Sequence, residues 1–293
     1  LLLYCYNNVL YYNKLFKKIN INLYSNNILE EFKKIPIMDK RVVRENFTEL
    51  ISKEYNKSSL YEVATGGTTG KPLKYYWSKE CFKEEWAFKI YFWNIAINYK
   101  PTLKKATFRG VKFGDELFYE NPMYNEIRFS PFKLNDKYVE QIINKLNKYK
   151  PTYIHGYPSA IELLGKNYEK YSYKLPKLNG IILISENVFP GQIEYLSKKF
   201  NAPVYSFYGH SERVIFASMM EDLDYYYLHP SYGFTELLDD NKKIILESNK
   251  LGELIGTGFI NKAMPLIRYR TGDFAEYAEE SKVKNNRHFK AIK

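Results

Sequence analysis

Residues 60–77 read LYEVATGGTTGKPLKYYW, a glycine- and threonine-rich segment between two runs with strand character. Glycines let backbone N–H groups approach an anion, threonines add hydroxyl donors, and a lysine adds a charge suited to phosphate. We therefore expect a hairpin whose connecting loop handles phosphate, and an ordinary surface turn is the alternative. The loop consists of Thr65, Gly66, Gly67, Thr68, Thr69, Gly70 and Lys71.

The segment is not a Walker phosphate loop. That motif requires a glycine five residues before its Gly-Lys pair, where Thr65 stands, and Ser or Thr after the lysine, where Pro72 stands. It also leads into a helix, whereas residues 73–77 are aromatic and favour a strand.

Length and composition indicate a globular protein of one large domain or two modest ones. The 293 residues are 45% hydrophobic and 26% charged. Two cysteines are too few for a disulfide framework or a Cys-rich zinc site, which fits a cytoplasmic protein. No apolar run reaches the roughly 20 residues of a membrane-spanning helix, so we expect no membrane partner. Because the chain begins with Leu1 and not Met, we expect a fragment that is incomplete at its N-terminus.

The net charge of +11 and the 29 tyrosines raise the question of nucleic-acid binding. The lysines are spread along the chain and form no basic block, and no nucleic-acid motif is present. We therefore expect no nucleic-acid partner. Attraction of anionic cofactors is the simpler use of this charge.

The first 60 residues are expected to form a helical scaffold. Two helices within residues 4–34 would pack one apolar face inward, and a third, within 38–50, would be capped by Asp39. A longer helix capped by Ser78 carries an aromatic stripe that we interpret as core. The residues expected on the inward face of the first pair are Leu10, Leu15, Phe16, Ile19, Ile28, Leu29 and Phe32.

Residues 136–207 alternate between strands and helices and predict a parallel β-α-β core. The expected strands are 152–155, 181–184 and 203–207, with a capping box at 159–162 opening the first intervening helix. Ligands bind at the carboxyl ends of parallel strands. Those ends are His155-Gly156-Tyr157, Ser185-Glu186 and Tyr208-Gly209-His210-Ser211-Glu212.

The third of these ends combines an aromatic, a hydroxyl and a carboxylate, which can stack on a base, contact a phosphate and hold a hard cation. For Glu212 alone, a helix-start carboxylate is the alternative. For His155 and His210, a hydrogen-bonded structural role is the alternative to a ligand or base.

The remainder of the chain is expected to be antiparallel. Residues 234–238 and 243–247 flank Asp239-Asp240-Asn241, a hairpin signal, and residues 252–259 form a further strand. An apolar strand within 264–267 would then lead into a turn that presents Asp273, whose carboxylate can accept both hydroxyls of a ribose. The predicted divisions are a helical scaffold at 1–60, an α/β core at 61–223 and an antiparallel subdomain at 224–293.

Three motifs stand in order along the chain: TGGTTGKP at 65–72, YGHSE at 208–212 and RYRTGD at 268–273. Together they resemble the adenylate-forming superfamily of acyl-CoA ligases and adenylation domains. IPIMDKRVVREN at 35–46, KPTYIHGYPSA at 150–160, LISENVFP at 183–190 and AMPLIRYRTGD at 263–273 resemble phenylacetate–CoA ligases and their relatives encoded with capsule biosynthesis. The resemblance extends from about Tyr4 to the end of the chain.

The resemblance implies a role for each motif. Residues 65–71 would handle the β- and γ-phosphates of ATP, with Lys71 and Glu212 in catalytic roles, although Gly66 replaces a serine of many relatives. Ser185-Glu186-Asn187 would lie on the adenine side, and Tyr157 and Pro158, with His155 and His210, near the acid substrate. Within the second and third motifs, Tyr208 and Gly209 would line the adenine, Ser211 would contact the α-phosphate, Glu212 would hold Mg²⁺ and Asp273 would bind the ribose.

The implied activity is that of an AMP-forming acid–thiol ligase. ATP and a small carboxylic acid would give an acyl-adenylate and pyrophosphate, and coenzyme A would then accept the acyl group. A capsule-linked relative with a sugar or carrier as acceptor is one alternative, and a non-catalytic nucleotide-binding remnant is the other. Because relatives continue into a hinge and a lid domain that carries a further lysine, we expect this chain to be the large N-terminal domain without its lid. Neither Lys290 nor Lys293 is assigned the role of that lysine.

Overall fold

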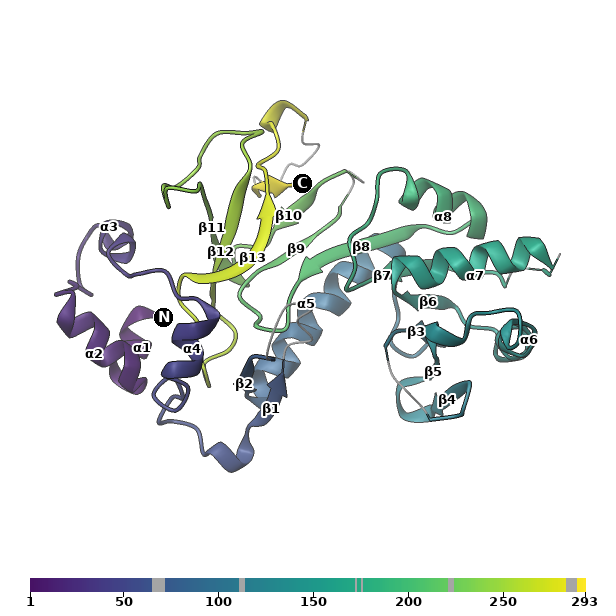
Figure 1. Cartoon of the computed structure of the whole chain (residues 1–293), viewed down its shortest axis with the longest axis horizontal. Coiled ribbons are helices and arrows are strands. Elements are labelled where there is room, and N and C mark those ends of the chain that lie inside the picture. Colours follow the sequence, from purple (N-terminus) through teal and green to yellow (C-terminus); the bar gives the residue numbers. More distant parts are fainter. Residues whose placement is uncertain (65–71, 111–113, 172, 175, 221–223, 283–288) are drawn as a thin grey trace. The chain divides into compact units, whose positions relative to one another are not determined.

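The structure, a computed structural model, describes all residues except 65–71, 111–113, 172, 175, 221–223 and 283–288 (Figure 1). It divides into two compact units. Unit 1 contains residues 1–86 and 209–293, and unit 2 contains residues 87–208. The three divisions predicted from the sequence remain a prediction.

Unit 2 is built on a mainly parallel sheet with strand order β8-β7-β6-β3-β5-β4. Each pair from β8 to β5 is parallel, and β4 pairs with β5 in the antiparallel sense. The predicted parallel core is therefore confirmed. The strands are β3 (Lys105–Phe108), β4 (Phe118–Asn121), β5 (Glu126–Phe129), β6 (Tyr153–Gly156), β7 (Gly180–Leu183) and β8 (Val204–Gly209), the last ending on the first residue of unit 1.

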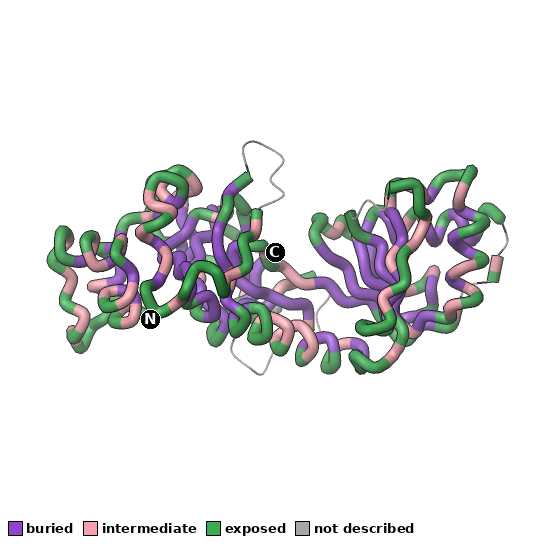
Figure 2. The backbone as a smooth tube through the Cα atoms, turned by 90° about the horizontal axis from the view of Figure 1, so that it is seen from below, coloured by how far each residue is buried: buried purple, intermediate pink, exposed green. Residues whose placement is uncertain are grey.

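Each helix of unit 2 buries one apolar stripe against this sheet. In α6, four apolar residues at helical spacing are at most 1% exposed, and the helix ends at Tyr149, followed by Lys150 in a left-handed conformation before Pro151. The strands β6 and β7 are buried along their whole length, as expected for parallel strands covered on both faces. Figure 2 colours the buried residues purple. The helices are α6 (Val139–Tyr149), α7 (Pro158–Lys170), α8 (Gln192–Phe200) and the second half of α5 (Lys79–Ile97).

Glycine is required where β6 ends. A Cβ atom built on Gly156 would lie 2.2 Å from the backbone oxygen of Phe108 on the neighbouring strand β3. Any side chain at this position would force β3 and β6 apart, at the edge where the candidate site begins.

Unit 1 contains antiparallel strands and short helices. A three-stranded sheet has the order β11-β12-β13, β10 pairs with β9 and β14, and β1 pairs with β2. The strands are β1 (Tyr61–Ala64), β2 (Lys74–Trp77), β9 (Phe216–Ser218), β10 (Tyr226–Leu228), β11 (Gly233–Leu238), β12 (Gly252–Gly258), β13 (Tyr269–Ala275) and β14 (Ala291–Ile292). The helices are α1 (Leu2–Asn8), α2 (Leu10–Lys18), α3 (Ile28–Lys33), α4 (Lys40–Glu45) and the first half of α5.

The predicted hairpin around the first motif is confirmed as far as its strands. Tyr61 pairs with Trp77 and Ala64 with Lys74, in the antiparallel sense. The connecting residues 65–71 lie outside the described residues. Both predicted helix caps are also confirmed: Asp39 accepts from the N–H of Val42, and Ser78 accepts from the N–H of Cys81.

The predicted helical face near the N-terminus is wrong in part. Leu10, Ile28 and Leu29 are 52%, 37% and 57% exposed. For Leu10 the cause is a break at Val9, which leaves the helix to bridge Ser52; the exposure of Ile28 and Leu29 in α3 has no structural explanation here. The break shifts the buried face of α1 and α2 to Cys5, Tyr12 and Phe16. The aromatic stripe predicted as core in α5 is also only partly buried. Phe82, at its N-terminal end, is 42% exposed, whereas Trp93 is buried.

Two strand predictions in the last third are also wrong. The hairpin turn forms, since the N–H of Asp239 donates to Lys243 and the N–H of Ile245 donates to Leu237, but residues 243–247 make only the single antiparallel bridge from Ile244 to Leu238 and form no strand. The apolar run 264–267 is not a strand, and β13 begins at Tyr269. Among the described residues, no helix combines the length and apolarity needed to cross a bilayer.

Candidate functional site

The carboxyl ends of β6, β7 and β8 lie at one edge of the sheet in unit 2. Gly156 pairs with Leu183, and Leu183 pairs with Ser206, so the residues that follow these positions emerge side by side. The described members of the predicted site at this edge are His155, Tyr157, Pro158, Ser185, Glu186, Asn187 and Tyr208.

At this edge, Glu186 has a contact that the sequence analysis did not anticipate. Helix α7 begins at Pro158 with Tyr157 as its N-cap, so the predicted capping box at Ser159 is wrong. The N–H of Ser159 instead donates to the carboxylate of Glu186 at 3.1 Å. A carboxylate at a helix N-terminus is favourable because it meets unpaired N–H groups and the positive end of the helix dipole. Ser185 adopts a left-handed conformation, φ 62°, which turns the chain after β7.

Tyr157 is fixed at the same edge by Gly110. The backbone N–H of Gly110 donates to the Tyr157 hydroxyl at 3.0 Å, and a Cβ atom on Gly110 would lie 2.7 Å from that oxygen. The phenol therefore has a defined position beside the end of β3.

His155 is buried among charged groups of neighbouring strands. Its Nδ1 lies 3.4 Å from the hydroxyl of Thr107, which donates to Glu126 at 2.6 Å. Glu126 also accepts from Arg128 and lies 3.5 Å from the Lys105 ammonium. Burial, reinforced by nearby cations, holds the pKa of His155 well below its usual range. This setting favours the structural alternative for His155.

In unit 1, the second motif forms a turn directly after β8. The N–H of Arg213 donates to the carbonyl of His210 at 3.1 Å, and the chain continues into β9. The alternative in which Glu212 starts a helix is therefore wrong, since a strand follows the turn.

Glu212 is buried, and its carboxylate is held by the third motif. The hydroxyl of Tyr269 donates to Glu212 Oε1 at 2.8 Å, and His210 Nδ1 lies 3.9 Å from Oε2. Burial beside this carboxylate raises the pKa of Tyr269, so the phenol remains a donor at neutral pH. The structure thus joins two motifs that are 57 residues apart in the sequence.

The charges of Glu212 and Asp273 both affect the pKa of His210. Burial lowers the pKa of His210, and the negative charges of Glu212 and Asp273 partly offset that effect. Both carboxylates therefore act on the same imidazole. Of the predicted residues in unit 1, the structure places His210 beside Glu212, and Asp273 acts on His210 through its charge.

Asp273 is exposed within β13 and not in a turn beyond a strand. The pairing of β12 with β13 shifts register there, and Gly272 has φ 84°. Thr271 donates to the carbonyl of Leu254 and accepts from the N–H of Asp273. This irregularity gives Asp273 a fixed backbone position on the strand.

The two arginines of the third motif form structural ion pairs. Arg268 makes two hydrogen bonds to the buried Glu236 and two to the carbonyls of Lys33 and Ile35. Arg270 pairs with Glu253 on the adjacent strand. Neither arginine has a role predicted from the sequence, and Tyr269 was not among the predicted site residues, although the aromatic residue inside RYRTGD was the available signal.

Glu212 fits a magnesium ion that is held chiefly by a substrate. Within the part of the chain that the structure describes, no group of three or more His, Cys, Asp or Glu side chains could hold a metal ion. Mg²⁺ commonly uses one or two carboxylates together with substrate phosphates and water, so a single carboxylate meets this requirement. The predicted phosphate-binding residues Thr65 to Lys71 lie outside the described residues.

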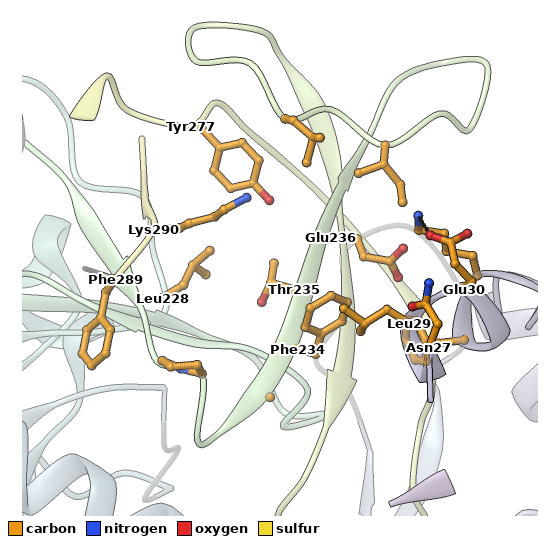
Figure 3. Close-up of a pocket in the computed structure, with 16 residues that line it drawn as sticks. Asn27, Leu29, Glu30, Leu228, Phe234, Thr235, Glu236, Tyr277, Phe289 and Lys290 are labelled. Carbon is orange, nitrogen blue, oxygen red and sulfur yellow. Dashed lines mark hydrogen bonds and ion pairs between the residues drawn. The ribbon is translucent and has the colours of Figure 1, made fainter. Parts of the chain in front are cut away.

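A cavity of about 490 Å³ lies elsewhere in unit 1, between α3, β11 and the segment before β14 (Figure 3). Its walls include Leu29, Phe234 and Leu228, and the Lys290 amine lies 4.5 Å from the centre of the Tyr277 ring. Its lining contains none of the described residues predicted for the nucleotide site.

The fold defines the class: it is the fold of the N-terminal domain of adenylate-forming enzymes. The 2-hydroxyisobutyryl-CoA ligase in complex with R3-HIB-AMP aligns with a TM-score of 0.71 at 16% identity, over 94% of this chain and 60% of that one. The acyl-CoA synthetase of Brucella canis aligns with a TM-score of 0.53 at 17% identity, over 81% and 45% of the two chains. The fold class predicted from the sequence is confirmed.

Among curated proteins, Protein CapK of Staphylococcus aureus is similar to this chain. The two are 25% identical over 280 residues, which cover 93% of this chain and 60% of CapK. No protein-family model matches. The resemblance to adenylate-forming enzymes stated from the motifs is confirmed by these relatives, and this chain spans 60% of the length of CapK.

Proposed function

We propose that this chain carries the nucleotide site of an enzyme that activates a small carboxylic acid with ATP and transfers the acyl group to a thiol, coenzyme A in the first instance. The observation that carries the proposal is the contact between Tyr269 and Glu212. It joins the second and third motifs and sets a buried carboxylate close to the Asp273 strand. The order of the motifs along the sequence does not by itself show that Glu212 lies next to the strand that carries Asp273.

The proposed reaction has two steps. A carboxylate oxygen of the acid attacks the α-phosphorus of ATP, and the bond from that phosphorus to the pyrophosphate oxygen breaks. The thiol sulfur then attacks the carbonyl carbon of the acyl-adenylate, AMP leaves and the thiol proton passes to water. Neither step needs a side-chain nucleophile, so the protein contributes positioning and charge stabilisation.

Most of the predicted residues have a place in this proposal. Tyr208, Gly209 and the 185–187 segment would border the adenine, Ser211 would contact the α-phosphate and Asp273 would bind the ribose hydroxyls. Glu212 would hold Mg²⁺, which when bound neutralises charge on the phosphates, and Tyr269 would orient that carboxylate. Residues 65–71, with Lys71, would meet the β- and γ-phosphates, and Tyr157, Pro158 and His210 would lie toward the acid. His155, whose buried setting favours a structural role, is not given a substrate contact.

The related structures support the proposed class of reaction, formation of an acyl-adenylate followed by transfer to CoA. The ligase that this fold matches was captured with 2-HIB-AMP and CoA, an acyl-adenylate and its acceptor. Because this chain spans 60% of CapK and of the ligase chain, the activity of a whole enzyme is part of the proposal.

A second candidate is the same adenylation with a sugar or a carrier as acceptor. The similarity to Protein CapK favours it, since the sequence motifs resemble the capsule-linked branch. The two candidates share the first step and differ only in the second.

Acid-dependent exchange of labelled pyrophosphate into ATP tests the first step. It should be run with a panel of aromatic and short-chain acids, on the 293-residue chain and on the longest product of the same gene. Exchange with any acid supports adenylation, and consumption of the adenylate on adding CoA then identifies the acceptor. Nucleotide binding without exchange for any acid in either form would overturn the enzymatic proposal in favour of a nucleotide-binding remnant.

A further inference from the structure

Arg213, the residue after Glu212, is a buried cation with no part in the reaction proposed above. Its side chain is 1% exposed, and its backbone is left-handed, with φ 56°. That conformation is costly for a residue with a Cβ atom, so the surrounding structure must hold it in place. The question is which contacts do so.

Glu85, Cys81 and Trp77 contact the Arg213 guanidinium, and the centre of the Phe82 ring lies 5.8 Å from its carbon. Nη2 lies 2.7 Å from the carboxylate of Glu85, whose side chain is 12% exposed. Nη1 donates to the Cys81 sulfur at 3.1 Å, and the guanidinium carbon lies 3.5 Å from the centre of the Trp77 ring. A planar cation stacked on an indole and paired with a carboxylate is a rigid arrangement that lysine cannot reproduce.

Trp77 contacts the second motif in a second way. Its indole N–H donates to the carbonyl of Ser211 at 3.2 Å. The same side chain therefore holds the backbone before Glu212 through its nitrogen and the residue after Glu212 through its ring face. Glu212 sits between two fixed points.

Strand β12 packs against the turn formed by residues 210–213. A Cβ atom on Gly258 would lie 2.7 Å from the backbone oxygen of Arg213, and one on Gly256 would lie 2.5 Å from the side chain of Val214. Glycine at both positions lets β12 pack directly against this turn. The turn has little freedom to move as a body.

We propose that Trp77, Cys81, Glu85 and Arg213 form a positioning clamp, which sets the carbonyl of Ser211 and the carboxylate of Glu212 for Mg-nucleotide binding. This inference rests on the proposed function. The four residues act through Ser211 and Glu212 and touch no substrate. A displacement on the order of 1 Å at such a site can cost up to about a hundredfold in rate, so a clamp of this kind has a measurable effect.

The test compares Trp77→Phe, Arg213→Lys and Arg213→Met with the matched control Trp86→Phe, a tryptophan on α5 whose ring edge meets Phe82. Hydrogen–deuterium exchange of residues 209–214 in the nucleotide-free protein is the first readout. We expect about tenfold faster exchange there in the clamp variants, because the turn loses its fixed points, and unchanged exchange in β12. The control should exchange like the unmodified chain.

The second readout is the Mg²⁺ dependence of ATP binding. The clamp variants should need about tenfold more Mg²⁺ for half-maximal ATP binding, with Arg213→Lys between Arg213→Met and the unmodified chain. The double variant Arg213→Met/Glu85→Met removes the unpaired buried charge. Its melting temperature should recover relative to Arg213→Met while its Mg²⁺ response stays weak, which a purely structural role would not produce.

Normal exchange at 209–214 in Trp77→Phe and Arg213→Met would overturn the clamp, whatever the nucleotide result. Faster exchange with an unchanged Mg²⁺ response would overturn its role in nucleotide binding. Absence of any ATP binding by the unmodified chain would instead overturn the proposed function, and the exchange data would still decide whether the clamp holds the turn.

Discussion

The hydroxyl of Tyr269 donates a 2.8 Å hydrogen bond to Oε1 of Glu212. Both side chains are buried, so neither group can exchange this bond for water without local rearrangement. The bond fixes one oxygen of the carboxylate that we propose for Mg²⁺. It also makes the start of β13 part of the site, and not only Asp273 further along that strand.

Tyr269→Phe should weaken both stability and the response to Mg²⁺. Loss of a hydrogen bond to a charged acceptor lowers the free energy of unfolding by roughly 1.5–3 kcal/mol. Since Glu212 also loses its orientation, more Mg²⁺ should be needed for half-maximal ATP binding. Denaturant unfolding and titration of Mg²⁺ at fixed ATP measure the two effects.

Tyr12→Phe is the matched control for that variant. The Tyr12 hydroxyl is also buried, donating to Pro265 and accepting from the N–H of Ile267. It should lose stability and keep the Mg²⁺ response. If both variants respond equally to Mg²⁺, Tyr269 does not orient Glu212 for Mg²⁺ binding.

Glu212→Gln and Asp273→Asn should have different kinetic effects. A group that acts through Mg²⁺ contributes most as pyrophosphate separates, so Glu212→Gln should mainly lower kcat. A ribose contact is the same before and during reaction, so Asp273→Asn should mainly raise KM for ATP, by roughly 1–3 kcal/mol in binding. Pyrophosphate exchange at varied ATP gives both constants. If both carboxylates are only structural, each variant will lose melting temperature with no selective change in either constant.

Arg268→Met should destabilise the fold without altering the nucleotide site. It leaves Glu236 buried and unpaired, and breaking a buried ion pair in this way costs about 3–5 kcal/mol. The double variant with Glu236→Met should recover much of that loss. If the single variant lowers the free energy of unfolding by less than about 1 kcal/mol, water solvates the Glu236 carboxylate in the folded protein, which would contradict its burial.

His155 should make the protein less stable in acid. Its pKa in the folded state lies well below 6.5, so below pH 6.5 the unfolded chain binds a proton that the folded chain does not. Stability therefore falls as the pH drops through about 6.5, with a slope for this one group that rises toward about 1.4 kcal/mol per pH unit once the unfolded-state imidazole is fully protonated. In His155→Gln, the slope of unfolding free energy against pH between about 6.5 and 5 should decrease by that amount. An unchanged slope would mean that His155 takes up its proton in the folded state.

The parallel core was predictable because periodicity and strand ends are local signals. Residues 181–184 are uniformly apolar, and α6 carries its stripe at helical spacing, so the edge with Tyr157, Ser185 and Tyr208 followed from the order of elements. The exposure of Leu10 was not predictable, since a single bridge between Val9 and Ser52 rotates the buried face.

The contacts that build the site were not local either. Tyr269 and Glu212 are 57 residues apart, and Arg213 and Cys81 are 132 apart. The motifs named Glu212 and Asp273, but the residues that hold them depend on tertiary packing. Glu186 illustrates the same limit, because its hydrogen bond to Ser159 replaces a capping box that the sequence favoured.

Calorimetric titration of the 293-residue chain with ATP, with and without Mg²⁺, tests the central claim most directly. We predict saturable binding of one nucleotide that tightens with Mg²⁺. The Mg²⁺ enhancement should be lost in Glu212→Gln, and affinity with and without Mg²⁺ should fall in Asp273→Asn. Absence of binding, or equal binding by the unmodified chain and both variants, would contradict a nucleotide site built on these two carboxylates.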